Sequence, residues 1–220
     1  MIDSVKNIQL KRIPKPALSR LCKIYNLLEE LEVKGNLSVS SKEIGKRLGV
    51  GSHNIRKDMG YIGETGISGS GYEIIKLKAH IDAALGLSKE RNACIIGLGG
   101  LGIVIMNYQK PLLPCFNIAA GFDSNINILE TINISIPVYP TYEITEVIIE
   151  KNIELAVITE PDRNIGKIME RLYEGGIKGI INFTPVMLSS ESETVYIRNI
   201  DIVSEFRYLS ALFSLQDQKL

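Results

Sequence analysis

Six residues from Gly97 to Gly102, GLGGLG, match the spacing G-x-G-x-x-G of loops that bind the phosphates of dinucleotides. In this pattern the first glycine permits a tight turn and the second lets a pyrophosphate approach the backbone. The third lets the following helix pack closely on a strand. The N-terminus of that helix offers unpaired N–H groups and a positive dipole end to the phosphates. The sequence therefore predicts a dinucleotide-binding loop made of Gly97, Leu98, Gly99, Gly100, Leu101 and Gly102.

A carboxylate at the expected spacing supports the same chemistry. Asp123 lies 21 residues after Gly102, at the end of the apolar run 118–122. A carboxylate in this position accepts hydrogen bonds from the adenosine ribose hydroxyls, and it repels a 2′-phosphate. We therefore expect NADH or NAD⁺ in preference to NADPH or NADP⁺. The alternative is a glycine-rich turn in some other α/β fold.

The loop must be held between a strand and a helix, and the sequence predicts both. Residues 93–96 form a short apolar run, typical of a strand buried on both faces of a parallel sheet. Residues 101–106 continue as an apolar helix that ends near Tyr108, with Pro111 beyond it as a stop signal. Further apolar runs at 137–139, 153–158, 177–183 and 195–197 alternate with helical stretches. This β-α-β order predicts an α/β protein with a Rossmann domain, a doubly wound parallel sheet, over residues 86–200.

The first 85 residues predict a separate, smaller domain. Apolar residues recur at helical spacing over 18–31, and Ser40 with Glu43 forms a capping box that begins a second helix. After a glycine turn, Ser52 is placed to cap a third helix over 52–59, and this arrangement is a helix-turn-helix. The glycine-rich stretch 60–75 fits the β-ribbon of a winged helix. The alternative is a plain three-helix dimerisation module.

Charge and helical spacing indicate that this domain meets DNA. Residues 1–80 hold 14 Lys and Arg against 8 Asp and Glu, whereas residues 81–220 hold 11 against 17. A basic first part favours a polyanionic partner, although an ordinary solvated basic face would have the same balance. Ile55 and Met59, four residues apart, would face the core. His53, Asn54, Arg56 and Lys57 would then point outward, near the end of the helix that reaches base edges.

Other features exclude several classes of protein. No apolar stretch reaches the ~18 residues that a membrane span requires, and the N-terminus lacks the apolar core of a signal peptide. Cys22, Cys94 and Cys115 are odd in number and lack C-x-x-C spacing. They predict buried free thiols in a cytoplasmic protein and no metal site.

Several segments together resemble the Rex family of redox-sensing transcriptional repressors. They are SSKEIGKRLGV, IRKDMGYIGETGISGSGY, GLGGLG…NY, AAGFD, GIKGIINFTP and NIDIVSEF. The resemblance implies a homodimer that holds a palindromic, AT-rich operator and releases it when NADH binds. It also implies that a C-terminal helix over 201–220, with an apolar stripe from Ile202 to Phe213, is exchanged between the subunits. The alternative is a helix folded back on its own sheet.

The resemblance also implies roles for particular residues. Tyr108 would lie beside the nicotinamide, while Asp201 and Arg20 would form a switch by pairing in one state of the dimer. The simpler alternatives are a core aromatic, a helix cap and a solvated charge. Besides the glycine loop and Asp123, the predicted cofactor-binding residues are Tyr108, Thr159, Glu160, Pro161, Asn182 and Phe183. The predicted DNA-binding residues are Ser52, His53, Asn54, Arg56, Lys57, Tyr61, Gly69, Gly71 and Tyr72.

The second hypothesis is an enzyme, either an NAD-dependent dehydrogenase or a Rossmann enzyme that binds a nucleotide or CoA. A dehydrogenase needs a proton donor, commonly His, Lys or Tyr, but His53 and His80 both precede the predicted sheet. The sheet extends almost to Asp201, which leaves no substrate domain, so we expect no catalytic residue. Under the enzyme hypothesis, Tyr108 and Lys178 are the alternatives. One departure from the family is notable: Thr159-Glu160-Pro161-Asp162 stands where Thr-Val-Pro-Ala is usual. Two added carboxylates are expected to weaken the binding of an anionic dinucleotide unless they point to solvent or meet a cation.

Overall fold

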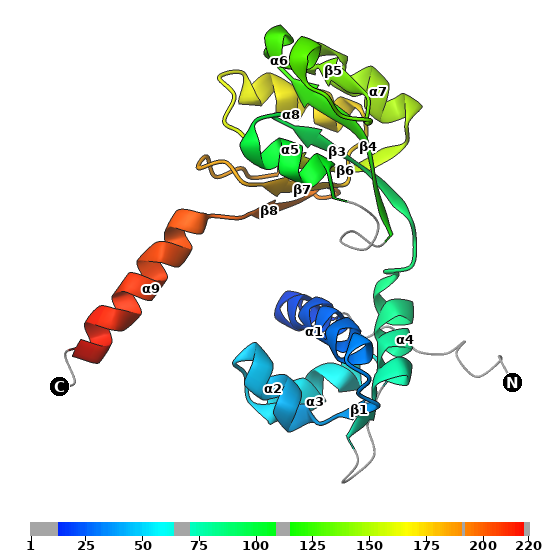
Figure 1. Ribbon diagram of the computed structural model, residues 1–220, viewed down its shortest axis with the longest axis vertical. Coiled ribbons are helices and arrows are strands. Elements are labelled where there is room, and N and C mark those ends of the chain that lie inside the picture. Colours follow the sequence, from blue (N-terminus) through cyan, green and yellow to red (C-terminus); the bar gives the residue numbers. More distant parts are fainter. Residues whose placement is uncertain (1–12, 64–70, 109–114, 191, 218–220) are drawn as a thin grey trace, which may run out of the picture. The chain divides into compact units, whose positions relative to one another are not determined.

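The computed structural model describes residues 13–63, 71–108, 115–190 and 192–217, and the chain divides into two compact units between Lys89 and Glu90 (Figure 1). The first unit is a winged-helix domain. Its helices are α1 (Lys15–Val33), α2 (Ser41–Leu48), α3 (Ser52–Tyr61) and α4 (Ile74–Leu85). Its two-stranded antiparallel sheet joins β1 (Ser38–Val39) to β2 (Tyr72–Glu73).

Local signals explain where α2 and α3 begin and end. The Ser40 hydroxyl accepts a hydrogen bond from the Glu43 N–H at 3.1 Å, which confirms the predicted helix start. Gly49 ends α2 in the left-handed conformation with φ of +69°. The expected cap of the third helix was wrong by one residue. Gly51 precedes α3, and Ser52 is its first helical residue.

The core of the first unit is formed mainly by α1, α3 and α4, together with Ile44 of α2 and Val39 of β1. Ile55 and Met59 are fully buried, as predicted, and they pack with α1 residues such as Leu28. Helix α4 was not predicted, although Ile74, Leu77 and Ile81 recur at helical spacing and are buried. The expected β-ribbon over 60–75 therefore ends earlier than predicted, and β2 pairs with β1. Residues 64–70, including Gly69, lie outside the described residues.

The second unit is built on a six-stranded sheet in the order β5-β4-β3-β6-β7-β8. The strands are β3 (Arg91–Ile96), β4 (Phe116–Asp123), β5 (Val138–Pro140), β6 (Ile153–Ile158), β7 (Gly179–Asn182) and β8 (Tyr196–Asn199). All neighbouring strands are parallel, so the sheet has the dinucleotide-binding Rossmann order and confirms the predicted fold. The helices are α5 (Gly100–Met106), α6 (Ile126–Thr131), α7 (Ile144–Glu150), α8 (Ile165–Glu174) and α9 (Ile202–Asp217), with a 3-10 turn, η1, over Thr141–Glu143.

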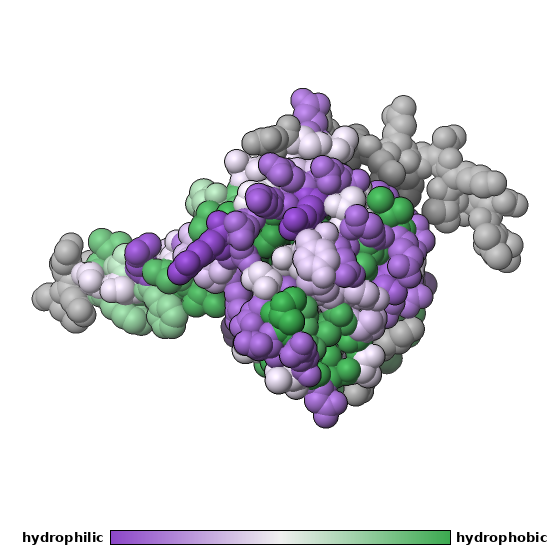
Figure 2. Space-filling model, turned by 90° about the horizontal axis from the view of Figure 1, so that it is seen from above, coloured by the Kyte–Doolittle hydropathy of each residue, from purple (hydrophilic) through white to green (hydrophobic). Residues whose placement is uncertain are grey.

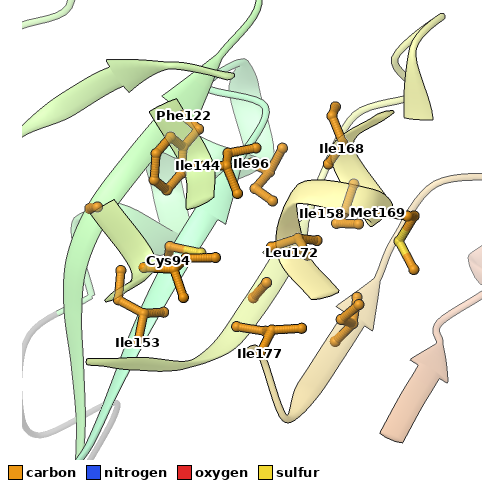
Figure 3. Packing of buried hydrophobic residues seen from close by; sticks show 14 of the residues in the cluster. Cys94, Ile96, Phe122, Ile144, Ile153, Ile158, Ile168, Met169, Leu172 and Ile177 are labelled. Atoms are coloured by element: carbon orange, nitrogen blue, oxygen red, sulfur yellow. The ribbon is translucent and has the colours of Figure 1, made fainter. Parts of the chain in front are cut away.

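Alternate residues of each central strand enter cores on opposite faces of this sheet. On β3, Cys94 and Ile96 belong to the cluster that α7 and α8 cover, and Figure 3 shows Leu172 and Ile168 of α8 near Ile158. Ile95 belongs to the cluster on the α5 side. Burial raises the pKa of the Cys94 thiol to about 12. The expectation of buried thiols holds for Cys94 alone, because Cys22 is exposed and Cys115 is half-buried.

An ion-pair cluster joins the N-terminal ends of β3, β6 and β7, at the edge of the sheet opposite the glycine loop. Glu154 at the start of β6 contacts Arg91 Nη1 at 2.7 Å and is also paired with Lys178. Hydrogen bonds from Lys178 and Arg91 lower the pKa of Glu154 to about 2. Two cations therefore hold the ionised form of this carboxylate.

Helix α9 has little to pack on within its own chain. All side chains from 202 to 216 are exposed, including Phe206 at 71 %. Figure 2 shows that hydrophobic residues are prominent on the surface of this helix. The alternative of a helix folded back on its own sheet is therefore wrong for the isolated chain.

No helix among the described residues is long and apolar enough to span a membrane.

Candidate dinucleotide site and nucleic-acid interface

The glycine loop joins β3 to α5 with the geometry that its spacing predicts. Gly97 has φ of +92°, which favours glycine. A Cβ on Gly102 would lie 2.0 Å from the Gly97 carbonyl oxygen, so only glycine allows α5 to start this close to β3. The loop lies at the carboxyl end of β3, between β4 and β6, where the strand order reverses. Open α/β sheets bind their ligands at this place.

Two predicted cofactor residues hold the loop in shape. Asp123 is 6 % exposed, and its carboxylate accepts hydrogen bonds from Leu98 N–H at 2.7 Å and Asn125 N–H at 2.8 Å. The Thr159 hydroxyl donates to the Gly97 carbonyl at 2.6 Å. The spacing of the motif does not reveal these loop-supporting contacts, which join residues 25 and 62 positions apart. Each carboxylate oxygen has a second lone pair, so Asp123 retains acceptor capacity for ribose hydroxyls.

A pocket beside the loop is rich in carboxylates. Its lining residues are Ile96, Gly97, Asp123, Ser124, Thr141, Glu160, Pro161 and Asp162. The glycine backbone fits a pyrophosphate, because no side chain rises from Gly97, Gly99 or Gly102. The Glu160 carboxylate lies in the same space: a Cβ on Gly99 would be 1.5 Å from Glu160 Oε1.

Other predicted cofactor residues have different surroundings. The buried amide of Asn182 donates to Val186 O at 2.7 Å and to Asn199 Oδ1 at 2.8 Å, and it accepts from Thr184 N–H at 3.0 Å. Its donors are thus used in holding the segment between β7 and β8, so its prediction as a ligand group is corrected to a structural one. Phe183 is half-buried against the core on the α5 side. Tyr108 is exposed, two residues beyond the end of α5.

Helix α3 presents the predicted polar surface. His53, Asn54, Arg56 and Lys57 are all exposed, and Ser52 and Tyr61 are half-buried. Arg56 Nη1 donates to the Ser41 hydroxyl of α2 at 3.3 Å, which links the two helices of the helix-turn-helix. These side chains form an exposed basic face on the second helix of the motif, the helix that enters the major groove in this class of domain.

The prediction for Tyr72 needs correction. Its side chain is 5 % exposed and belongs to the core of the winged-helix domain, so the ring is withdrawn from a DNA surface. Gly71 has φ of +76°, and a Cβ there would lie 2.5 Å from the Val39 carbonyl oxygen. Gly71 is therefore required where the chain returns alongside β1.

Arg20 has a partner that the sequence did not reveal. Its Nε donates to Asp58 Oδ2 at 2.6 Å and its Nη2 donates to Asp58 Oδ1 at 2.8 Å, which joins α1 to α3. Asp58 is 1 % exposed, while the Arg20 side chain is 27 % exposed. Hydrogen bonding to Asp58 raises the pKa of the Arg20 guanidinium. The expectation of a solvated charge at Arg20 is therefore wrong.

Asp201 caps α9. Its Oδ1 accepts from Val203 N–H at 3.0 Å and Ser204 N–H at 3.2 Å, and its Oδ2 accepts from the Ser204 hydroxyl. These bonds, the Ser204 hydroxyl first, lower the pKa of Asp201. Among the residues that the structure describes, no group of three His, Cys, Asp or Glu side chains is arranged to hold a metal ion.

Comparison with known proteins agrees with this arrangement. Residues 12–60 match the family model described as "Putative DNA-binding protein N-terminus", and residues 88–186 match the one described as "CoA binding domain". The redox-sensing transcriptional repressor Rex of Lactiplantibacillus plantarum is 34 % identical over 95 % of this chain and 92 % of its own length. Redox-sensing transcriptional repressor Rex 1 of Thermotoga maritima is 36 % identical over 91 % of this chain and 95 % of its own.

The chain belongs to the Rex family. Solved structures of a Rex-family repressor, RSP, have the same fold. RSP in complex with β-NAD⁺ and operator DNA superposes with a TM-score of 0.82 at 28 % identity, and the match covers 94 % of each chain. RSP in complex with β-NADH superposes with a TM-score of 0.81 at 27 % identity, covering 94 % of this chain and 97 % of RSP. The resemblance predicted from the sequence is thereby confirmed.

Proposed function

We propose that this protein is a DNA-binding transcriptional repressor that senses the NADH/NAD⁺ ratio, binding its operator when NADH is low and releasing it when NADH binds. One observation carries the proposal: a single chain joins an exposed basic helix, α3, to a glycine loop at the switch point of a Rossmann sheet. The Rex-family repressor RSP has been solved both with NAD⁺ and operator DNA and with NADH. We place the protein in the cytoplasm, together with the operator DNA that it binds.

Residue roles follow from this proposal. Residues 1–85 bind DNA through Arg56, Lys57 and their neighbours on α3, residues 86–200 bind the cofactor, and residues 201–220 join the dimer. The glycine loop receives the pyrophosphate, and Asp123 accepts hydrogen bonds from the adenosine ribose. When bound, the nicotinamide supplies the redox difference, because its ring is charged in NAD⁺ and neutral in NADH.

A homodimer is supported by the exposure of α9. Its apolar side chains include Phe206 and Phe213, which are exposed in the isolated chain. Their burial against a second subunit would remove apolar surface from water, which favours association. A palindromic operator is the expected partner of such a two-fold symmetric dimer.

The switch must connect the cofactor to the recognition helix. A guanidinium has five N–H donors, and Asp58 uses the Nε and one Nη2 donor of Arg20. Donors therefore remain for a second carboxylate, and we assign that role to the partner subunit's Asp201. Arg20 would then transmit the position of α9 through Asp58 to α3, while Tyr108 responds to the nicotinamide.

An operator-binding assay tests the function. The full-length protein should shift an AT-rich palindromic operator, and NADH should release it without being consumed. Arg56→Ala combined with Lys57→Ala should abolish operator binding and leave NADH affinity unchanged, because both residues lie on α3 and the cofactor site is separate. The loss of phosphate contacts should also flatten the salt dependence of any residual binding. Lys15→Ala combined with Lys23→Ala, two exposed α1 residues, is the matched control for net charge. Normal operator binding by the α3 double variant at moderate salt would contradict the assignment.

The match to a CoA-binding model favours one second candidate, a Rossmann enzyme that binds CoA. Against it, the two histidines of the chain both precede β3. Calorimetric titration with CoA and with NADH separates the two candidates. Tighter binding of CoA, or steady consumption of NADH by a supplied substrate, would favour the enzyme.

A further inference from the structure

Glu160 follows β6 and directs its side chain into the glycine loop. A Cβ built on Gly99 would lie 1.5 Å from Glu160 Oε1 and 2.9 Å from Oε2, so both carboxylate oxygens lie against the second glycine of the motif. A Cβ on Gly97 would be 3.0 Å from Glu160 Cβ. The Glu160 side chain therefore fills the space that the absence of side chains at Gly97 and Gly99 creates, with its carboxylate at Gly99.

A bound pyrophosphate needs the same space. The second glycine of the motif is the position at which the backbone must be open to phosphate oxygens. A carboxylate at that position excludes them by volume, and it also repels them as a like charge in a partly buried pocket. Cofactor binding therefore requires the Glu160 carboxylate to leave Gly99.

Glu160 differs from the other two carboxylates of the pocket. Asp123 is held by the N–H groups of Leu98 and Asn125, and Asp162 accepts from Asn164 N–H at 2.6 Å. Within the described part of the chain, Glu160 has no hydrogen bond or ion pair that would fix it at Gly99. Its displacement therefore requires rotation about its side-chain bonds but breaks no hydrogen bond or ion pair.

We propose that Glu160 is an affinity-determining residue whose carboxylate competes internally with the dinucleotide pyrophosphate; this proposal rests on the dinucleotide-sensing function. The pyrophosphate is common to NADH, NAD⁺ and ADP-ribose, so Glu160 weakens all three by the same factor. It raises the NADH concentration needed for operator release and leaves the preference between NADH and NAD⁺ unchanged.

Calorimetric titration of the full-length protein with NADH, NAD⁺ and ADP-ribose tests the proposal. Glu160→Gln keeps the size of the side chain and removes its charge. We expect this variant to bind all three ligands about tenfold more tightly, because the displaced Glu160 carboxylate stays in the pocket, and a like charge near the pyrophosphate disfavours the complex by about this factor. Glu170→Gln, on the exposed surface of α8, removes the same charge elsewhere and should change affinity less than about twofold.

The possible results separate this proposal from the function on which it rests. A gain for NADH or NAD⁺ without a gain for ADP-ribose would overturn it, because Glu160 would then contact the nicotinamide half. Unchanged or weaker binding by Glu160→Gln would also overturn it, while binding of NADH by the wild type would leave the proposed function intact. If neither the wild type nor Glu160→Gln binds any of the three ligands, the dinucleotide-sensing function itself fails. Binding by Glu160→Gln alone would support both.

Discussion

Replacing Arg20 with Ala is expected to destabilise the winged-helix domain strongly. The substitution removes both hydrogen bonds, at 2.6 and 2.8 Å, that hold the Asp58 carboxylate. Asp58 is 1 % exposed, so its charge would remain buried without its cation. Removing one partner of a buried ion pair costs about 3–5 kcal/mol. Because 27 % of the Arg20 side chain is exposed, we expect the lower end of this range, about 3 kcal/mol.

The companion variants separate the ion pair from the loss of packing. Asp58→Ala leaves a guanidinium that water can reach, so its cost should be smaller, about 2 kcal/mol. The double variant removes both charges together and should cost about 3 kcal/mol, well below the sum of the single costs. The coupling free energy of the cycle is then about 2 kcal/mol. Lys34→Ala, which breaks the exposed pair with Glu30, is the control and should cost less than about 0.5 kcal/mol.

Chemical denaturation of the full-length protein measures these costs. The chain has no tryptophan, so unfolding is followed by circular dichroism, with calorimetry to separate the transitions of the two units. About 3 kcal/mol corresponds to a fall of about 12–24 °C in the Tm of a domain of this size. If the single effects add within about 0.5 kcal/mol in the double variant, Arg20 and Asp58 are not coupled and the reasoning fails.

Three further predictions concern pH, cofactor choice and the switch. Since the pKa of Glu154 is about 2 in the folded protein, its contribution is complete above about pH 4.5 and is lost as the pH falls towards 2. Denaturation should show that Glu154→Gln lowers the free energy of unfolding by about 1–2 kcal/mol at pH 7. The loss is small because Lys178 is mostly exposed. If the variant is still less stable than the wild type by this amount at pH 2, the reasoning is contradicted. Asp123→Ala should weaken NADH binding by about 1–3 kcal/mol, and equal calorimetric affinities of the wild type for NADH and NADPH would count against a ribose role. Asp201→Ala should weaken operator binding, and Tyr108→Phe should reduce the difference between the effects of NADH and NAD⁺ on operator binding. The coupling free energy between the cofactor and operator sites should fall by about 1–3 kcal/mol. If both variants keep wild-type operator affinity and still release the operator fully when NADH binds, the switch lies elsewhere.

Patterns within a few residues of one another predicted most of the elements. Helical spacing of apolar residues predicted α1, and the Ser40–Glu43 capping box predicted the start of α2. Apolar runs that alternate with helical stretches predicted the strands of the sheet. Helix α4 was missed because its first residues continue a glycine-rich stretch that favours a ribbon. Caps and periodicity depend on neighbours in the chain, so they can be recognised before the fold is known.

Contacts between distant residues depended on the tertiary structure. Arg20 and Asp58 are 38 positions apart, and the carboxylate at Gly99 belongs to Glu160, in the loop after a different strand, β6. Asn182 appeared to be a ligand residue because it ends a strand at the ligand-binding edge, yet its amide is used by Val186, Thr184 and Asn199. The sequence by itself determined which strand ends meet at the site, since the carboxyl ends of strands in a parallel sheet share one edge. Which of them face a ligand, and which hold the loop, was decided by hydrogen-bond partners that only the packed chain brings within 3 Å.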